Sequence, residues 1–167
     1  TANLTVIEGH ARFESATTVR VNGDLLEAPQ IFINVGGRAL VPPMSGVHEV
    51  PYLTNSSMMD VDFLPEHLIV VGGSYIGLEF GQMYRRFGSE VTIIQRNAQL
   101  VPREDSDIAQ AIRGILEDEG IRILTDADAT RIDSRGGAVA VSVTAGGKKS
   151  EVVGSHLLVA TGRRPNT

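Results

Sequence analysis

The stretch from Leu68 to Arg96 constrains the fold more than any other part of the sequence. A short apolar run over residues 68–71 has the length and the β-branched residues of a buried strand. It leads directly into Gly72-Gly73-Ser74-Tyr75-Ile76-Gly77, where apolar residues begin to recur at helical spacing: Ile76, Phe80, Met83, Tyr84 and Phe87. Gly88 then ends the helical pattern, and a second apolar run covers 91–94. Strand, glycine turn, helix and strand in about thirty residues predict a βαβ unit.

The glycines of this turn have distinct physical roles. Gly72 permits the tight turn from strand to helix, and Gly77 permits close packing of the helix on the strand. The start of the helix offers unpaired N–H groups and the positive end of its dipole to a pyrophosphate. Ser74 stands where the usual pattern has its middle glycine. In this context the turn predicts a dinucleotide-binding site, and the alternative is a turn that only packs α/β structure.

Composition limits the possible partners and chemistry. A chain of 167 residues forms one medium domain, or one domain and part of another. Its net charge of -5 argues against nucleic acid or an anionic membrane as a general partner. The sequence has no cysteine, its four histidines lack metal-ligand spacing, and we expect neither a metal site nor a catalytic residue in it. Without a signal-peptide pattern or a membrane-length apolar run, we expect a cytoplasmic protein.

The remaining sequence extends this pattern on both sides. Before the central unit, short strands are expected at 4–7, 11–13 and 19–21, with a hairpin turn at Asn22-Gly23, and a buried strand at 31–35. After it, a helix opens near Ser106, with an apolar stripe formed by Ile108, Ala111, Ile112, Ile115 and Leu116. A strand at 121–124, a meander over 127–153 and a last buried strand at 156–160 complete the pattern.

Each half of the chain therefore contains a meander that leads to a buried strand ending in glycine. Two related nucleotide-binding domains, one of them truncated at its start, would give this arrangement. The predicted fold class is α/β. We expect a Rossmann-like domain with a parallel sheet, helices and a three-stranded β-meander, together with part of a second similar domain.

Three motifs together carry a family resemblance. They are residues 33–36 before Pro42, residues 70–79 with the glycine turn, and residues 160–167, which read ATGRRPNT. In order and separation they resemble the central part of a flavin-dependent pyridine nucleotide-disulfide oxidoreductase. This group includes mercuric reductase, dihydrolipoamide dehydrogenase and glutathione reductase. Serine at the middle glycine position also resembles mercuric reductases.

The resemblance implies a division of the chain and a set of missing parts. Residues 1–65 would be the C-terminal part of a truncated FAD-binding domain, 66–154 the NAD(P)-binding domain, and 155–167 its final strand and the return to the FAD domain. The redox cysteines would precede Thr1, and a dimerisation domain would follow Thr167. The parent, expected to be a homodimer, would pass a hydride from the nicotinamide nucleotide to FAD and on to a disulfide, metal-ion or other acceptor. The chain alone would be inactive.

The choice of nicotinamide nucleotide depends on the end of the second strand. NAD-specific relatives place a carboxylate there to bind the adenosine ribose. This sequence has Gln95 and Arg96 at that point, with Arg103 seven residues further on. Two guanidinium groups suit a 2′-phosphate, so NADP(H) is favoured over NAD(H). The alternative is that both arginines are solvated surface charges.

The resemblance also implies roles for single residues. Glu79 would lie by the nicotinamide and reach towards a flavin-domain lysine. We expect it to be buried without that partner, which would favour its protonated form. Tyr75 would cover the nicotinamide pocket or pack in the core. Gly162 would let the backbone approach the nicotinamide, Gly36 the flavin, and Ala129 would line the adenosine pocket, although either glycine could simply end a strand.

Two other functions remain open at this point. One is a free-standing nucleotide-binding or sensing module without chemistry of its own. The other is a structural α/β domain whose nucleotide site has decayed, although Gly72 and Gly77 are intact.

Overall fold

The computed structural model describes residues 3–166, which divide into two compact units, 3–36 and 37–166. Thr1, Ala2 and Thr167, at the outer limits of the predicted domains, lie outside the described residues. Each unit is considered by itself. The predicted limit at residue 65 is not tested by this division and stays a prediction.

The first unit is a small antiparallel sheet in the order β1-β2-β3. It contains β1 (Arg12–Phe13), β2 (Thr18–Val21) and β3 (Asp24–Glu27). Asn22 and Gly23 join β2 to β3 with φ angles of 52° and 97°. Positive φ at both central residues is the geometry of the tight hairpin turn that this dipeptide favours, so the predicted hairpin is confirmed.

Two strands predicted in this unit are absent. Residues 4–7 and 31–35 belong to none of its sheets, and the side chain of Phe32 is 90% exposed. The prediction of a buried strand at 31–35 is wrong for this chain. An apolar run of this kind becomes a buried strand only between neighbouring strands and under a packed layer, and the described part of the unit supplies neither.

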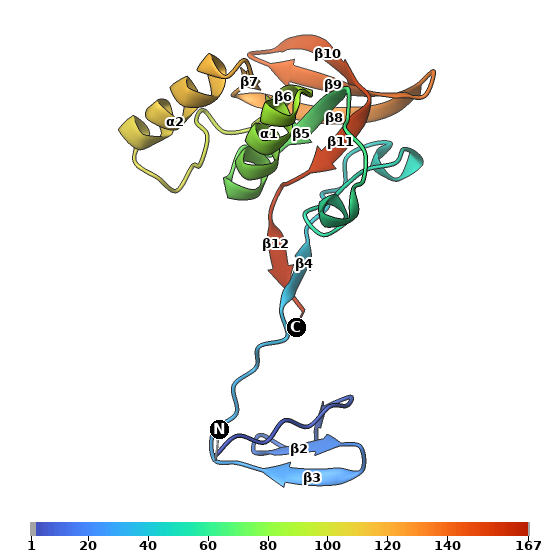
Figure 1. Ribbon diagram of the computed structural model, residues 1–167, viewed down its shortest axis with the longest axis vertical. Coiled ribbons are helices and arrows are strands. Elements are labelled where there is room, and N and C mark those ends of the chain that lie inside the picture. The colour runs from blue at the N-terminus through green and yellow to red at the C-terminus, as the bar shows by residue number, and fades with distance from the viewer. Residues whose placement is uncertain (1–2, 167) are drawn as a thin grey trace. The chain divides into compact units, whose positions relative to one another are not determined.

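The second unit is built on a parallel four-stranded sheet in the order β11-β5-β6-β7 (Figure 1). The strands are β5 (His67–Val71), β6 (Glu90–Ile94), β7 (Arg122–Leu124) and β11 (His156–Val159). Helix α1 (Tyr75–Phe87) connects β5 to β6, and α2 (Ser106–Asp118) connects β6 to β7. The α/β fold class predicted from the sequence is confirmed.

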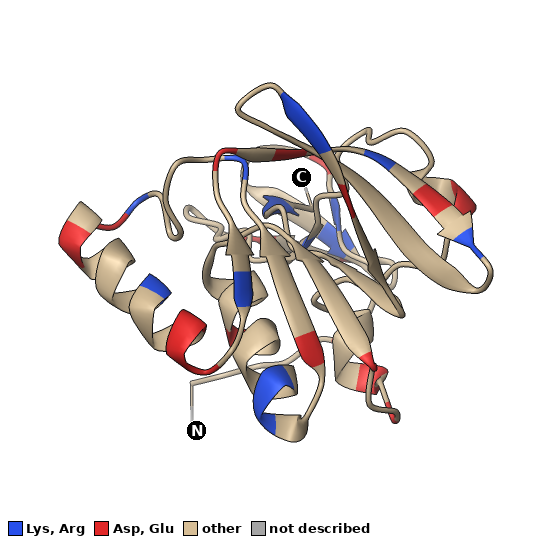
Figure 2. Ribbon diagram, turned by 90° about the horizontal axis from the view of Figure 1, so that it is seen from above, with Lys and Arg blue, Asp and Glu red and all other residues tan. Residues whose placement is uncertain are grey.

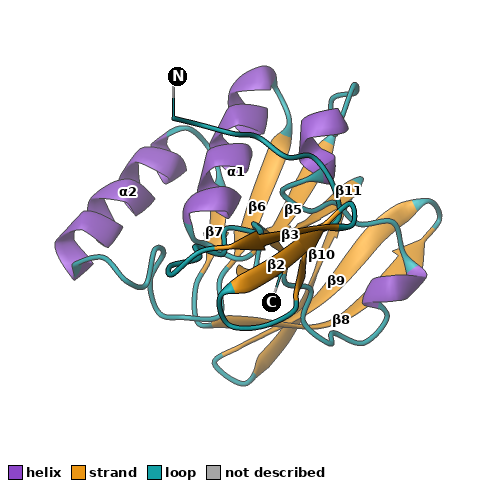
Figure 3. Ribbon diagram, turned by 90° about the horizontal axis from the view of Figure 1, so that it is seen from below, coloured by secondary structure: helices purple, strands orange, loops and turns teal. Residues whose placement is uncertain are grey.

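Alternate residues of the sheet enter two separate cores. Leu68 and Val70 of β5 pack in a cluster with residues of α1 and α2, whereas Ile69 and Val71 pack in a cluster with the meander. Figure 3 shows both helices beside the same sheet. Glu90 and Arg122 are the only Asp, Glu, Lys or Arg in the four strands, and each begins its strand (Figure 2). The two-sided burial explains why these strands read as continuous apolar runs.

The meander covers the sheet face opposite the helices. It contains β8 (Ala127–Arg135), β9 (Ala138–Ala145) and β10 (Lys148–Gly154), paired antiparallel. Two short 3-10 helices, η1 (Val47–Glu49) and η2 (Ser57–Asp60), precede the sheet. The strands β4 (Gly37–Ala39), before the sheet in the chain, and β12 (Arg163–Pro165), after it, pair antiparallel as a separate ribbon. Leu53 forms a parallel bridge to Leu158, on the outer edge of β11.

The face that helix α1 turns to the sheet overlaps the predicted stripe only in part: Ile76, Phe80 and Tyr84 contact the core as predicted. Its buried residues are Gly77, Leu78, Gly81 and Tyr84, whereas Phe87, in the predicted stripe, is 62% exposed. The predicted stripe is therefore wrong in part. Gly77 and Gly81 let the helix backbone approach the strands closely, and Leu78 and Tyr84 pack beside them in the core.

Helix α2 shows a similar difference. Ala109 and Leu116 are buried, whereas Ile108 and Ile115 are exposed. Ile112 and Leu116 of the predicted stripe do contact the core, together with Ala109, so the prediction is wrong only in part. Asp105, not Ser106, occupies the N-cap position, and it makes no side-chain capping hydrogen bond. None of the helices in the described residues has both the length and the apolar character needed to cross a membrane.

Replacing Gly77 by alanine tests the close packing of α1. A Cβ there would lie 2.0 Å from the carbonyl oxygen of Gly72. The overlap is with backbone, so we expect Gly77→Ala to lower the free energy of unfolding by about 1–3 kcal/mol in urea denaturation.

Gly114→Ala is the matched control, because a Cβ at that helical position meets nothing within 4 Å. Alanine is the better helix former, so this variant should gain about 0.5–1 kcal/mol. Equal stability of the two variants would contradict the packing described for α1.

Candidate functional site

The candidate site lies where β5, β6 and β11 end. Gly72, Gln95 and Ala160 are the first residues after these strands, and carboxyl ends of parallel strands share one edge of the sheet. In the sheet, β5 has its successor β6 on one side and β11, which comes much later in the chain, on the other. Open α/β sheets bind ligands in the crevice at such a point, where the strand order reverses.

The glycine turn brings main chain close to main chain at this edge. Gly72 has a φ of 115°, and a Cβ on it would lie 2.4 Å from the carbonyl oxygen of Ala160. Ser74 is the N-cap of α1 but makes no side-chain capping hydrogen bond. The N–H groups at the start of α1 therefore stay available to an acceptor from outside the helix.

Two cavities meet over this turn. One of about 330 Å³ is lined by Arg96, Ala129 and residues of the 40–44 segment, and one of about 510 Å³ by the glycine turn, Arg103 and Gly162. Both are lined by Gly72, Gln95, Asn97 and Thr161. The shared residues make them two ends of one groove. We call it the β-edge groove.

Gln95 is held inside the wall of the groove. Its side chain is only 7% exposed, and its Oε1 accepts a hydrogen bond of 3.0 Å from the N–H of Gly73. Its Nε2 donates to Asn97 Oδ1 at 3.4 Å and to the carbonyl oxygen of Gln99 at 3.2 Å. The sequence predicted a neutral amide at this position, but it did not predict that both the oxygen and the nitrogen of the amide would be hydrogen-bonded within the chain.

The two arginines line the two cavities on either side of the residues that these cavities share. Arg96 lines the smaller cavity and Arg103 the larger one. Both are exposed, and neither has a hydrogen-bond or ion-pair partner among residues 3–166. Asp128, which sequence reasoning missed, lines the same cavity as Arg96. Exposed guanidinium groups without a counter-ion are suited to an incoming phosphate.

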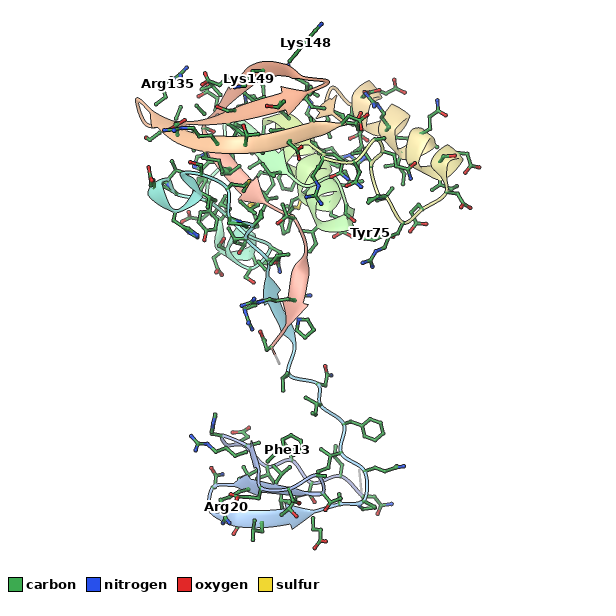
Figure 4. The ribbon with its side chains drawn as sticks, turned by 180° about the vertical axis from the view of Figure 1, so that it is seen from behind. Phe13, Arg20, Tyr75, Arg135, Lys148 and Lys149 are labelled. Carbon is green, nitrogen blue, oxygen red and sulfur yellow. The ribbon has the colours of Figure 1, made fainter. Side chains whose placement is uncertain are left out.

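Tyr75 extends from the first position of α1 and is labelled in Figure 4. Its ring is half exposed, and its hydroxyl donates a hydrogen bond to Glu104 Oε1. The hydrogen bond to this carboxylate raises the pKa of Tyr75. Smaller contributions come from desolvation and from the charge of Glu104, and Arg103 opposes them. Tyr75 is therefore tied to the loop that carries Arg103 and does not pack in the core.

The other predicted site residues are placed as follows. Ile76 lines the larger cavity and packs partly against the helix-side core. Gly162 has a φ of 129° and lines the larger cavity. Gly36, with a φ of 72°, belongs to the first unit and is not part of the groove described here. No group of three or more His, Asp or Glu within residues 3–166 is arranged to hold a metal ion.

The expectation that Glu79 is buried is wrong. Its side chain is exposed on α1, because the helix presents Gly77, Leu78 and Gly81 to the sheet and turns position 79 outward.

The Tyr75–Glu104 hydrogen bond can be tested by titration. A carboxylate that accepts from the neutral hydroxyl disfavours the tyrosinate, so Glu104→Gln should lower the pKa of Tyr75 towards its ordinary value of 10.0. Carbon-13 NMR of labelled tyrosine would follow this titration separately from those of Tyr52 and Tyr84.

Asp105→Asn is the control, because it removes the neighbouring charge and leaves the hydrogen bond in place. We expect it to change the pKa of Tyr75 less than Glu104→Gln does. An unchanged titration in Glu104→Gln would mean that the hydrogen bond is not formed in solution.

Comparisons with known proteins agree with this geometry. The family model described as "Pyridine nucleotide-disulphide oxidoreductase" matches residues 1–167. The chain is 36% identical over 165 residues to a mercuric reductase of Lysinibacillus sphaericus, covering 99% of this chain and 30% of that protein. It is 38% identical over 170 residues to the probable pyridine nucleotide-disulfide oxidoreductase RclA of Escherichia coli, covering 99% of this chain and 38% of that protein.

Solved structures give the same result. The HOCl-induced flavoprotein disulfide reductase RclA of Escherichia coli matches with a TM-score of 0.80 and 37% identity, covering 98% of this chain and 37% of that one. LpdA of Mycobacterium tuberculosis matches with a TM-score of 0.79 and 28% identity, covering 96% of this chain and 37% of that one. The chain thus spans between 30% and 38% of the length of these relatives. The resemblance inferred from the motifs is confirmed, and the chain belongs to the pyridine nucleotide-disulphide oxidoreductase family.

Proposed function

We propose that this chain is the NADPH-binding portion of an FAD-dependent oxidoreductase. The observation that carries the proposal is the β-edge groove, with the glycine turn and the free start of α1 in one wall and Arg96 at one end. A pyrophosphate would bind at the N–H groups that begin α1. The nicotinamide would extend along the larger cavity towards Tyr75 and Gly162, and the adenosine would occupy the smaller one beside Ala129.

The preference for NADP(H) over NAD(H) rests on charge. The residue at the end of β6 is a buried neutral amide, so it offers no carboxylate to the ribose hydroxyls. Arg96 follows it directly and has no counter-ion in the described residues. A 2′-phosphate would supply that counter-ion, with Arg96 as its main ligand and Arg103 as a second one from the far side of Gln95.

The chemistry of the whole protein is part of the same proposal. When bound, FAD would accept the hydride from NADPH and pass electrons to a disulfide, a metal ion or another acceptor. Within this chain, the groove binds and orients the nucleotide, and Glu79 remains available to a lysine of the flavin-binding part. We propose that the chain alone is inactive and that the whole protein is a cytoplasmic homodimer. The alternative is a stand-alone nucleotide-binding module.

Calorimetric titration with NADPH and NADH tests the nucleotide site. We expect NADPH to bind at least about tenfold more tightly, because a charged hydrogen bond to the 2′-phosphate contributes about 1.5–3 kcal/mol. Arg96→Ala should weaken NADPH binding by about ten- to a hundredfold and leave NADH binding nearly unchanged.

Arg122→Ala is the matched control, because Arg122 is also exposed and begins β7, at the opposite edge of the sheet. It should bind both nucleotides like the unchanged chain. Tighter binding of NADH than of NADPH would contradict the proposed 2′-phosphate site. So would an equal loss of affinity for the two nucleotides in Arg96→Ala.

A further inference from the structure

The hydrogen bonds of Gln95 fix both its position and the direction of its amide. The N–H of Gly73 can only donate, so the atom that faces it must be the oxygen of the amide. The carbonyl of Gln99 can only accept, so the atom that faces it must be the nitrogen. The partners on the two sides therefore determine the same orientation, and a buried amide with both ends bonded is costly to displace.

The loop that follows β6 is bound to the same glycine from its other side. The carbonyl oxygen of Gly73 accepts a 2.8 Å hydrogen bond from the N–H of Val101. Val101 is buried and has a φ of 39°, a conformation that a β-branched residue adopts only when its surroundings impose it. A Cβ on Gly73 would lie 2.6 Å from Leu100 Cδ2. Loop and turn are therefore closely packed against each other at Gly73.

The bonds continue from this contact to the residues that line the larger cavity. The N–H of Glu104 donates to the carbonyl oxygen of Val101 at 2.8 Å, and Gln99 Nε2 donates to the carbonyl oxygen of Glu104 at 3.0 Å. Glu104 in turn accepts from Tyr75. Arg103 lies inside this bonded segment. The position of residues 97–104 is thus set by contacts that begin at Gln95 and Gly73.

We infer that Gln95 is a positioning residue, which holds the 97–104 loop against the glycine turn, and that it is not a ligand of the ribose. The nucleotide part of this inference rests on the proposed function, whereas the contact between loop and turn does not. A carboxylate at this strand end usually binds the ribose of NAD(H), and the contacts of Gln95 predict a different result here. A glutamate at 95 keeps an acceptor for the Gly73 N–H, but its second oxygen then faces Asn97 Oδ1 and the Gln99 carbonyl oxygen. Acceptors would face acceptors there, so the carboxylate opens the loop and does not create an NAD(H) site.

The experiment compares Gln95→Met, Gln95→Glu and the control Gln110→Met in the full chain. Methionine at 95 keeps the volume and removes every hydrogen bond of the amide. Methionine at 110 makes the same substitution at an exposed position of α2 that lines neither cavity. Amide hydrogen exchange of Gly73 and Val101 is followed by NMR without nucleotide, with Ile69 and Val71 of β5 as internal references. Calorimetry then gives the affinities for NADPH and NADH.

In both Gln95 variants the amide hydrogen of Gly73 or Val101 should exchange about tenfold faster relative to those of β5. The loss of one hydrogen bond changes the opening equilibrium by about that factor. Gln95→Met should weaken the binding of NADPH and the binding of NADH by about the same factor. Gln95→Glu should bind NADH no more tightly than the unchanged chain does, and Gln110→Met should resemble the unchanged chain. If Gln95→Met does not fold, Gln95→Glu carries the test, because it keeps the bond to Gly73.

Two results would overturn the inference. One is a Gln95→Glu variant that binds NADH about tenfold more tightly while the loop amides exchange as before, since Gln95 would then stand at the ribose. The other is unchanged exchange in both Gln95 variants. The proposed function fails separately: if the unchanged chain binds neither nucleotide and the Gln95 variants still release the loop amides, the nucleotide site is wrong and the positioning role stands.

Discussion

The burial of β5 on both faces is the constraint on which the rest of the second unit depends. Leu68, Ile69 and Val70 have no exposed surface, and they alternate between the core under the helices and the core under the meander. A shift by one residue would exchange every side chain between two differently shaped cores, so the register is strongly determined. The point where the chain leaves the sheet, and with it the glycine turn, is fixed as a result.

Recognition at that point depends on main chain more than on side chains. The chain as a whole is acidic, with a net charge of -5, yet the β-edge groove offers helix N–H groups and two arginines without counter-ions among residues 3–166. A local positive region on an acidic protein attracts an anionic ligand without attracting polyanions generally. At Gly72 the backbone itself forms the wall of the groove, because a side chain there would overlap the carbonyl oxygen of Ala160.

Local sequence patterns predicted the central unit well. Glycines at 72, 88 and 120 have the positive φ angles that the predicted turns and helix ends require, and Asn22-Gly23 forms the predicted hairpin. Patterns failed where a distant neighbour decides the outcome. The strand at 31–35 needs a sheet to join, and the faces of α1 and α2 depend on how closely each helix approaches the strands. Position 79 is exposed for that reason.

The site was predictable as a set of positions but not as a set of contacts. Gln95 could be identified as the end of β6 because the apolar run of the strand stops there, whereas its bond to Gly73 joins residues 22 positions apart and depends on a buried loop conformation. The strained backbone of Val101 left no sign in the sequence. The sequence did not decide whether Tyr75 covers the nicotinamide pocket or packs in the core. Its hydrogen-bond partner, Glu104, lies in the loop just before α2.

The edges of the parallel sheet affect how the unit behaves towards other chains. One outer strand, β7, has only three residues and begins with Arg122, and the other, β11, is bridged by Leu53. A short, charged edge and a covered edge are the devices by which natural sheets avoid adding a strand from a neighbour. Neither edge of the sheet therefore favours the addition of a strand from a second copy of the chain, and the formation of larger sheets at high concentration is disfavoured.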